Sequence, residues 1–394
     1  MKKTGIKEWE FLKIVCTNYV LKNIDLNSKF LTIKENFDWE LFYSFANTNK
    51  VIPIVYDELK QLENIIIPKK IENNMFFYTK FIIEKNFTYS NELKKLNDVL
   101  NTHKIDFVAY KGIILSQYIY QNVGIRPTLD LDIMIKVEDL DKIKNILNLN
   151  NYEYSKPLSK NLLKNLKFII KKYIGDKIVY IDTHWRVSNL LLQMKVGYDE
   201  MISEAKLINF YGTKINLLNP EAHFIIIAMH HFGKNEMSLK QFIDLVVILE
   251  KFKDELNWTK LVMLSKKWKV YKLTLYSLKI CQEIINNNLP NKISQLIENE
   301  CDKKFINKNI NSFNLNKGKL NENVKDIFIG RIKLHLKIRD NFWIKLKIAY
   351  LHLKAFITPK EVDFKNPRKI SSLQWYLTFL KKPFCLFYKF YIKN

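Results

Sequence analysis

Apolar residues recur at the three- and four-residue spacing of amphipathic helices through most of the first hundred positions. The spacing is clear over 11–20 and again over 39–45. Ile52-Pro53 and Ile67-Pro68 interrupt it, because the residue before a proline is disfavoured in helical conformation. The pattern therefore predicts several helices over residues 5–102.

The period of the pattern changes after residue 102. Residues 105–110 form a short β-prone run that ends at Lys111-Gly112, and residues 129–135 alternate strictly between apolar and polar side chains. Strict alternation is typical of a strand with one buried face. Around these two strands the pattern predicts helices at 113–120 and 137–149, a strand at 177–182, and a hairpin from 206–210 and 214–218.

Helical spacing returns at Pro220. We expect helices at 220–233, 238–252, 257–268 and 270–287. Residues 303–323 are rich in Asn and Lys with few apolar residues, which favours a flexible connection. Further helices are predicted at 324–338 and 340–356, before an aromatic and basic tail at 372–394.

The order of elements predicts an α+β protein in which a small α/β core is embedded in mostly helical N- and C-terminal regions. Strands that interrupt a largely helical chain usually carry the functional site. The predicted parts are a helical N-terminal region at 1–102, the α/β core at 103–218, a helical domain at 219–302, and the connection with its helical, aromatic-basic region at 303–394.

Composition narrows the function classes. The 394 residues are 47% hydrophobic with 9 Gly and 9 Pro, which excludes disordered and collagen-like chains. The formal net charge of +24 would attract polyanions, so nucleic acid is a possible partner. Only five of the cationic residues are arginines, the side chain favoured for bidentate phosphate recognition, and a generally solvated basic surface explains the charge equally well.

Cysteine usage and hydropathy suggest a compartment. The four cysteines are far apart, without metal-site or disulfide spacing, which favours a reducing environment. The N-terminus lacks the apolar segment of a signal peptide, and no run reaches the length of a membrane span. We therefore expect a cytoplasmic protein.

Acidic residues follow the predicted strands of the core. Asp130 and Asp132 are two positions apart, which puts both carboxylates on one face, and Asp182 ends a neighbouring strand. Carboxylates so close together favour a divalent cation between them, and oxygen ligands suit Mg²⁺ (or Mn²⁺), which also coordinates phosphates. The alternative is an edge strand with an acidic exposed face.

Basic residues and a glycine lie near these aspartates. Gly112 would let backbone approach a phosphate at the start of a helix, and Lys111 and Arg126 would add positive charge. His184 would share the face of Asp182 and could orient a phosphate, although a structural hydrogen bond is equally consistent. His230 could line a nucleotide pocket, whereas joint zinc ligation by adjacent His230 and His231 is disfavoured.

Three segments together resemble a known family. They are Tyr110-Lys111-Gly112, then Arg126-Pro127-Thr128-Leu129-Asp130-Leu131-Asp132, and Asp182-Thr183-His184-Trp185. The sequence is similar here to the uncharacterised bacterial nucleotidyltransferase family of the DNA polymerase beta-like superfamily. The resemblance implies a polymerase beta-like core, with Asp130, Asp132 and Asp182 as metal ligands and catalytic carboxylates. It also implies that Lys111 and Gly112 bind nucleotide phosphates, although Ile113 departs from the second small residue usual in the superfamily.

The leading hypothesis is a metal-dependent nucleotidyltransferase that uses a nucleoside triphosphate and releases pyrophosphate. The acceptor is open: a small molecule, a peptide or protein, or RNA. One alternative is a toxin-like or tRNA-modifying enzyme that acts on RNA, and another is a catalytically silent binding module. The sequence contains no P-loop, no G-x-G-x-x-G and no Ser-His-Asp set, which disfavours kinases and dinucleotide enzymes.

Overall fold

The computed structural model describes residues 5–62, 64–154, 167–187, 196–233, 238–285, 288–316, 332–339, 342–358, 377–378 and 381. The chain divides into two compact units. The first holds 1–189 with 194–320, and the second holds 190–193 with 321–394. Every described strand belongs to the first unit.

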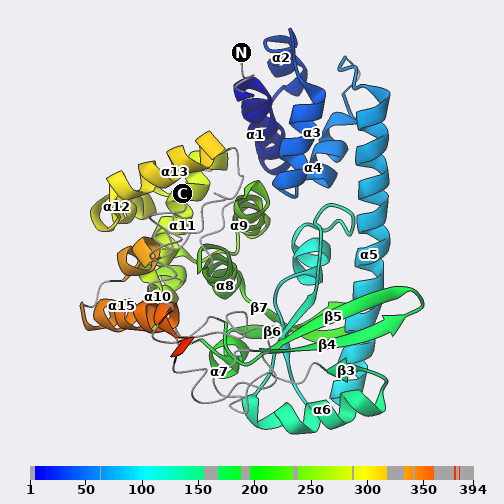
Figure 1. Ribbon diagram of the computed structural model, residues 1–394, viewed down its shortest axis with the longest axis vertical. Helices are drawn as coiled ribbons and strands as arrows, with labels where there is room; N and C mark the ends of the chain where they lie inside the picture. The colour runs from blue at the N-terminus through cyan, green and yellow to red at the C-terminus, as the bar shows by residue number, and fades with distance from the viewer. Residues whose placement is uncertain are drawn as a thin grey trace. The chain divides into compact units, whose positions relative to one another are not determined.

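Five helices form the N-terminal region, as the apolar spacing predicts. They are α1 (Ile6–Leu21), α2 (Leu26–Leu31), α3 (Trp39–Thr48), α4 (Ile52–Leu59) and α5 (Lys69–Thr102). Their starts have local causes: the Asp38 side chain accepts a hydrogen bond from the Leu41 amide, and Pro53 occupies the first turn of α4. The 34-residue helix α5 packs against α3 and α4 and also against the sheet, so it joins the two (Figure 1).

One mixed sheet contains the seven described strands. They are β1 (Val108–Ala109), β2 (Leu131–Met134), β3 (Glu153–Tyr154), β4 (Lys167–Ile174), β5 (Lys177–His184), β6 (Ala205–Phe210) and β7 (Thr213–Leu218). Their order is β3-β4-β5-β2-β1-β7-β6. Strand β2 is parallel to β5 and antiparallel to β1, and β1 is parallel to β7. The expected α+β class is confirmed.

Short helices link the strands. Residues 113–114 continue into the π-helical turn η1 (Leu115–Ile119) between β1 and β2, and the turn η2 (Val137–Asp139) leads into α6 (Leu140–Leu149) after β2. Helix α7 (Tyr198–Ile202) precedes β6. The expected hairpin is formed by β6 and β7, and Tyr211 and Gly212 at its tip both have positive φ, as a two-residue turn of type I′ requires.

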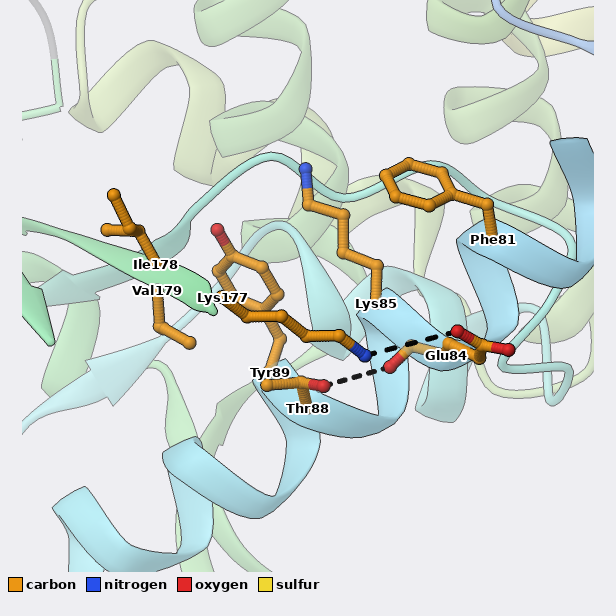
Figure 2. Close-up of a pocket in the computed structure, with 8 residues that line it drawn as sticks. All are labelled: Phe81, Glu84, Lys85, Thr88, Tyr89, Lys177, Ile178 and Val179. Carbon is orange, nitrogen blue, oxygen red and sulfur yellow. Dashed lines mark hydrogen bonds and ion pairs between the residues drawn. The ribbon is translucent and has the colours of Figure 1, made fainter. Parts of the chain in front are cut away.

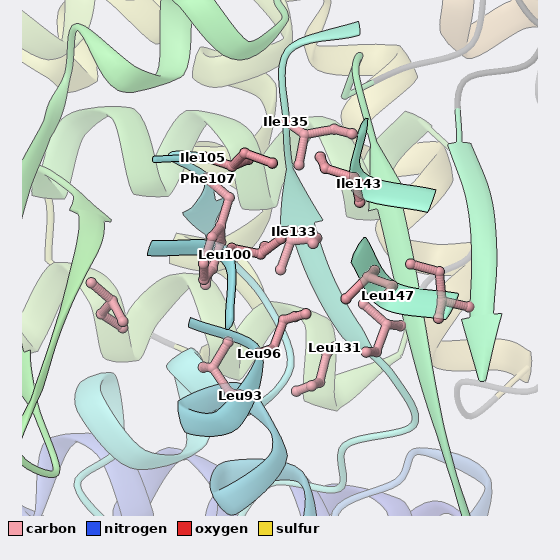
Figure 3. Close-up of a cluster of buried hydrophobic side chains, with 14 of the residues drawn as sticks. Leu93, Leu96, Leu100, Ile105, Phe107, Leu131, Ile133, Ile135, Ile143 and Leu147 are labelled. Carbon is pink, nitrogen blue, oxygen red and sulfur yellow. The ribbon is translucent and has the colours of Figure 1, made fainter. Parts of the chain in front are cut away.

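The hydrophobic core lies between the sheet and helices α5 and α6 (Figure 3). Leu131 and Ile133 of β2 enter this core from one face of the strand, which is the period-two pattern of the sequence. The same core contains Leu93, Leu96 and Leu100 of α5 and Ile143 and Leu147 of α6. Asp132 lies between the two core residues of β2 and therefore points to the opposite face of the sheet.

Helices follow the sheet, and the first four of them match the four expected helices. They are α8 (Pro220–Gly233), α9 (Leu239–Lys251), α10 (Trp258–Lys267), α11 (Tyr271–Ile285), α12 (Asn291–Glu300) and α13 (Lys303–Asn316). Helix α13 corrects the expectation of a flexible connection over its length. Ile306 and Phe313 are buried there at helical spacing, so a few well-placed apolar residues outweigh the polar composition. Residues 317–323 of the expected connection lie outside the described residues.

The second unit contains a helix over 332–337 and helix α15 (Phe342–Ile357). His335 Nδ1 and His352 Nε2 lie 2.9 Å apart between these helices, and both side chains are buried. Most of the tail at 372–394 lies outside the described residues. Among the helices that the structure describes, none combines the length and the apolar character needed to cross a bilayer.

Candidate active site

Two aspartates face each other across adjacent parallel strands. Asp132 of β2 and Asp182 of β5 are register partners, and both side chains are buried. His184 lies two residues beyond Asp182 on the same face of β5, with its Nε2 3.0 Å from Asp132 Oδ1 and 3.9 Å from Asp182 Oδ2. The structure therefore brings together three of the residues singled out from the sequence.

Lys111 completes this cluster from the turn after β1. Its Nζ donates to Asp132 Oδ1 at 2.6 Å and lies 3.3 Å from Nδ1 of His230, which α8 supplies. The Lys111 side chain is only 7% exposed, so this ion pair is shielded from water. The site thus has a buried ammonium group directly beside the two carboxylates.

Electrostatics favour a charged Asp132. Burial alone would raise its pKa, but the Lys111 ammonium and the hydrogen bond with His184 outweigh burial and hold the pKa well below its usual range. Burial lowers the pKa of His184, with Lys111 acting in the same direction and Asp132 opposing it. A deprotonated carboxylate and a neutral imidazole are the forms that bind a metal ion.

The donor set fits a divalent cation. Ligand atoms of Asp132, Asp182 and His184 all lie within 4.8 Å of one another. Two carboxylates suit Mg²⁺ or Mn²⁺, and the imidazole adds a nitrogen donor that Mn²⁺ accepts readily. Asp130, expected to bind the metal together with Asp132 and Asp182, is outside this group of three and lies in the loop that precedes β2. Its negative charge acts on Lys85 and Tyr89 of α5 and also on Tyr110 after β1.

Gly112 has a specific reason to be glycine. Its φ is +51°, in the left-handed region that side chains rarely adopt, and a Cβ there would lie 2.6 Å from the Asp130 carbonyl oxygen. The turn after β1 therefore packs directly against the backbone of the aspartate loop. This contact sets the position of Lys111 relative to Asp130.

Comparison with known proteins identifies the family of the chain. Residues 35–286, more than half of the chain, match the family described as uncharacterised nucleotidyltransferase. The chain belongs to this family. The resemblance drawn from the three sequence segments is thereby confirmed at the level of the family.

Other comparisons add little. A solved nucleotidyltransferase-like protein, an antigen from Paracoccidioides brasiliensis, is similar at 13% identity over 56% of this chain and 92% of its own. Its TM-score is 0.35, too low to carry an argument. No curated protein matches the chain.

Arg126 contacts the backbone of the glycine turn at Gly112. Its Nε and Nη2 donate to the two carboxylate oxygens of Asp244 at 2.7 and 2.9 Å, and its Nη1 donates to the Gly112 carbonyl at 3.1 Å. Asp244 also accepts from the Tyr120 hydroxyl at 2.8 Å and lies 3.2 Å from His231 Nε2. Arg126 thus connects the turn to α9, while its charge still interacts with that of Asp132.

Sequence reasoning missed Tyr110 and His223. Tyr110 follows β1, its ring is 6.0 Å from that of His184, and burial with the nearby carboxylates raises the pKa of its phenol well above the usual value. His223 of α8 places Nε2 2.9 Å from the Tyr110 carbonyl oxygen, which joins α8 to the same turn. The only local signal for either residue was a polar group within an apolar run.

Proposed function

We propose that this protein transfers a nucleoside monophosphate from a nucleoside triphosphate to an acceptor hydroxyl. The observation that carries the proposal is the pairing of Asp132 with Asp182 in register, beside the buried ammonium of Lys111. Membership of a nucleotidyltransferase family supports the reaction class. Buried like charges on adjacent strands are costly unless cations neutralise them, and such arrangements are typical of catalytic sites.

The reaction balances without an oxidant or reductant. An acceptor oxygen forms a bond to the α-phosphorus, the bond from that phosphorus to the bridging oxygen of the β-phosphate breaks, and pyrophosphate leaves. Asp182 accepts the proton of the acceptor hydroxyl. Asp132, Asp182 and His184 would hold the divalent cation, which when bound supplies positive charge to the phosphate oxygens.

Several residues have roles in binding the donor in this proposal. Lys111, held between Asp132 and His230, contributes a point charge to the triphosphate. Gly112 leaves room for the phosphates to approach the turn, and Arg126 keeps the turn in place while adding to its positive potential. Asp130 approaches the cation or the acceptor from its loop beside the pair.

Transfer of a labelled nucleotide tests the proposal. The protein is incubated with each α-labelled triphosphate, Mg²⁺ or Mn²⁺, and separate RNA, protein and metabolite fractions from cells. We expect Asp182→Asn to abolish labelling, and Asp176→Asn, which changes an exposed aspartate in the turn before β5, to leave it intact. Circular dichroism controls for folding. Equal labelling by the two variants would exclude the proposed site.

A further inference from the structure

A cavity of about 250 Å³ lies between α5 and the start of β5 (Figure 2). Its walls are mostly apolar or aromatic with several charged groups, and the lining residues are Phe81, Glu84, Lys85, Thr88, Tyr89, Lys177, Ile178 and Val179. Ligand sites in proteins usually measure about 300–1,000 Å³, so this cavity is smaller than a typical site and would hold only part of a nucleotide. The proposed donor residues Lys111 and Gly112 do not line it.

Tyr89 connects the cavity to the aspartate loop. Its hydroxyl donates to the Leu129 carbonyl at 2.7 Å and lies 3.4 Å from the Tyr180 amide, so it contacts both the residue before Asp130 and strand β5. The negative charge of Asp130 acts on both Tyr89 and Lys85. A ligand in the cavity would therefore contact Tyr89, whose hydroxyl is bonded to the residue before Asp130.

Four residues of α5 form a ridge that leads into the cavity. Phe77, Phe81, Lys85 and Tyr89 are spaced four positions apart and so share one side of the helix. Exposure falls along the ridge, from 63% at Phe77 and 55% at Phe81 to 1% at Tyr89. Two exposed phenylalanines in line with a buried tyrosine form a surface for stacking planar rings.

The cationic groups of the cavity are Lys85 and Lys177, and its anionic groups are Glu84 and the neighbouring Asp130. Lys177 and Glu84 lie 4.0 Å apart at its edge and offset each other. Lys85 has no carboxylate within ion-pair distance among the described side chains, and it is half-buried beside the aromatic ring of Tyr89. A half-buried ammonium group beside aromatic side chains suits a nucleotide, whose base stacks on the rings and whose phosphate contacts the ammonium. The net charge of +24 acts in the same direction at longer range.

We propose that this ridge and cavity bind the 3′ end of a single-stranded polynucleotide as the acceptor of the transfer reaction. Bases stack on Phe77 and Phe81, a backbone phosphate meets Lys85, and the strand runs past Asp130 so that its terminal hydroxyl reaches Asp182. This assignment rests on the proposed function and specifies its acceptor. RNA and DNA share the recognised chemistry, and the experiment compares the two.

Binding is measured first, without nucleotide or metal. Fluorescence anisotropy follows a 5′-fluorescein-labelled single-stranded RNA, the DNA of the same sequence, and a blunt duplex. Phe81→Ala should weaken single-strand binding about tenfold, which is the usual effect of losing one stacking side chain. Phe87→Ala is the matched control, since Phe87 is 50% exposed on the same helix but on another side. Equal affinities of the two variants would overturn the assignment.

Transfer is measured next with the same oligonucleotides. The proposal expects one labelled nucleotide at a free 3′-hydroxyl and none on a strand whose 3′ end carries a phosphate. Lys85→Gln should reduce this transfer about tenfold while triphosphate affinity stays unchanged. A loss of triphosphate affinity in Phe81→Ala or Lys85→Gln would assign the cavity to the donor base and overturn the acceptor assignment.

The two proposals can fail separately. Metal-dependent labelling of a protein or metabolite fraction, with oligonucleotides inert, keeps the transferase and removes the polynucleotide acceptor. Single-strand binding that depends on Phe81, with no triphosphate binding by the wild-type protein, removes the transfer reaction and with it the acceptor role. Both readouts use the full chain.

Discussion

Arg126 and Asp244 are 118 positions apart and form a bidentate pair that is buried on both sides. If Asp244 is lost, the buried Arg126 guanidinium has no carboxylate partner. An unpaired buried charge is strongly unfavourable. We predict that Asp244→Ala lowers the free energy of unfolding by about 3–5 kcal/mol. Urea unfolding followed by circular dichroism measures this change.

A double variant separates charge pairing from packing. Replacing both partners by apolar residues, Arg126→Met with Asp244→Leu, removes the unpaired guanidinium and should be less destabilising than Asp244→Ala alone. Lys240, whose Nζ lies 3.5 Å from Asp244 Oδ2, loses its partner in both variants, so its effect cancels in the comparison. The Arg126→Met substitution also removes the hydrogen bond to the Gly112 carbonyl, so triphosphate binding should weaken even where the fold is retained. A double variant less stable than the single one would show that the pair itself stabilises the fold.

Gly112 provides a second prediction, with Gly175 as its control. Alanine at Gly112 combines a left-handed backbone, which costs about 1–2 kcal/mol, with a clash against the Asp130 carbonyl, so the total loss of stability should exceed about 2 kcal/mol. Gly175 has φ +56° but open space around a Cβ, so Gly175→Ala bears only the backbone cost. Thermal or urea unfolding of the two variants compares them, and equal losses would contradict the close contact.

Local patterns predicted the strands that carry the site. The alternation around Asp132 placed Leu131 and Ile133 in the core and the carboxylate on the other face, as the structure shows. Helix positions were also predictable, because apolar spacing and proline positions act over a few residues. These features depend on neighbours in sequence.

Contacts between distant segments could not be predicted in the same way. Strand β4 was missed because its apolar residues Phe168 and Ile170 are surrounded by lysines, and only pairing with β5 makes the segment a strand. The partner of Asp244 depends on how α9 meets the loop of Arg126, for which no local pattern exists. A charged residue within an apolar run was the only available signal.

Lys111 should contribute to nucleotide binding in a way that can be measured without turnover. Lys111→Gln removes the charge beside Asp132, and we expect it to weaken triphosphate binding about tenfold or more, as for the loss of a charge-assisted contact. Lys104→Gln, an exposed lysine before β1, is the control. Isothermal titration calorimetry with a triphosphate and Mg²⁺ reports both affinities, and equal values would remove Lys111 from the donor site.

Two buried histidines should make stability depend on pH. Burial lowers the pKa of His223 and of His231 from 6.5 to about 4, and the positive charge of Arg126 acts in the same direction on both. Between these pH values the unfolded chain binds a proton that the folded chain does not, so unfolding takes up protons. The free energy of unfolding therefore falls as the pH is lowered.

Above about pH 6.5 neither histidine lowers the free energy of unfolding. Each of them lowers it by about 3 kcal/mol when the pH has fallen to 4. Urea unfolding across this window should show it. The double variant His223→Gln and His231→Gln keeps a hydrogen-bond donor at each position and should flatten the profile, whereas exposed His103→Gln should not. A profile of the double variant as steep as that of the wild type would show that other groups control acid unfolding.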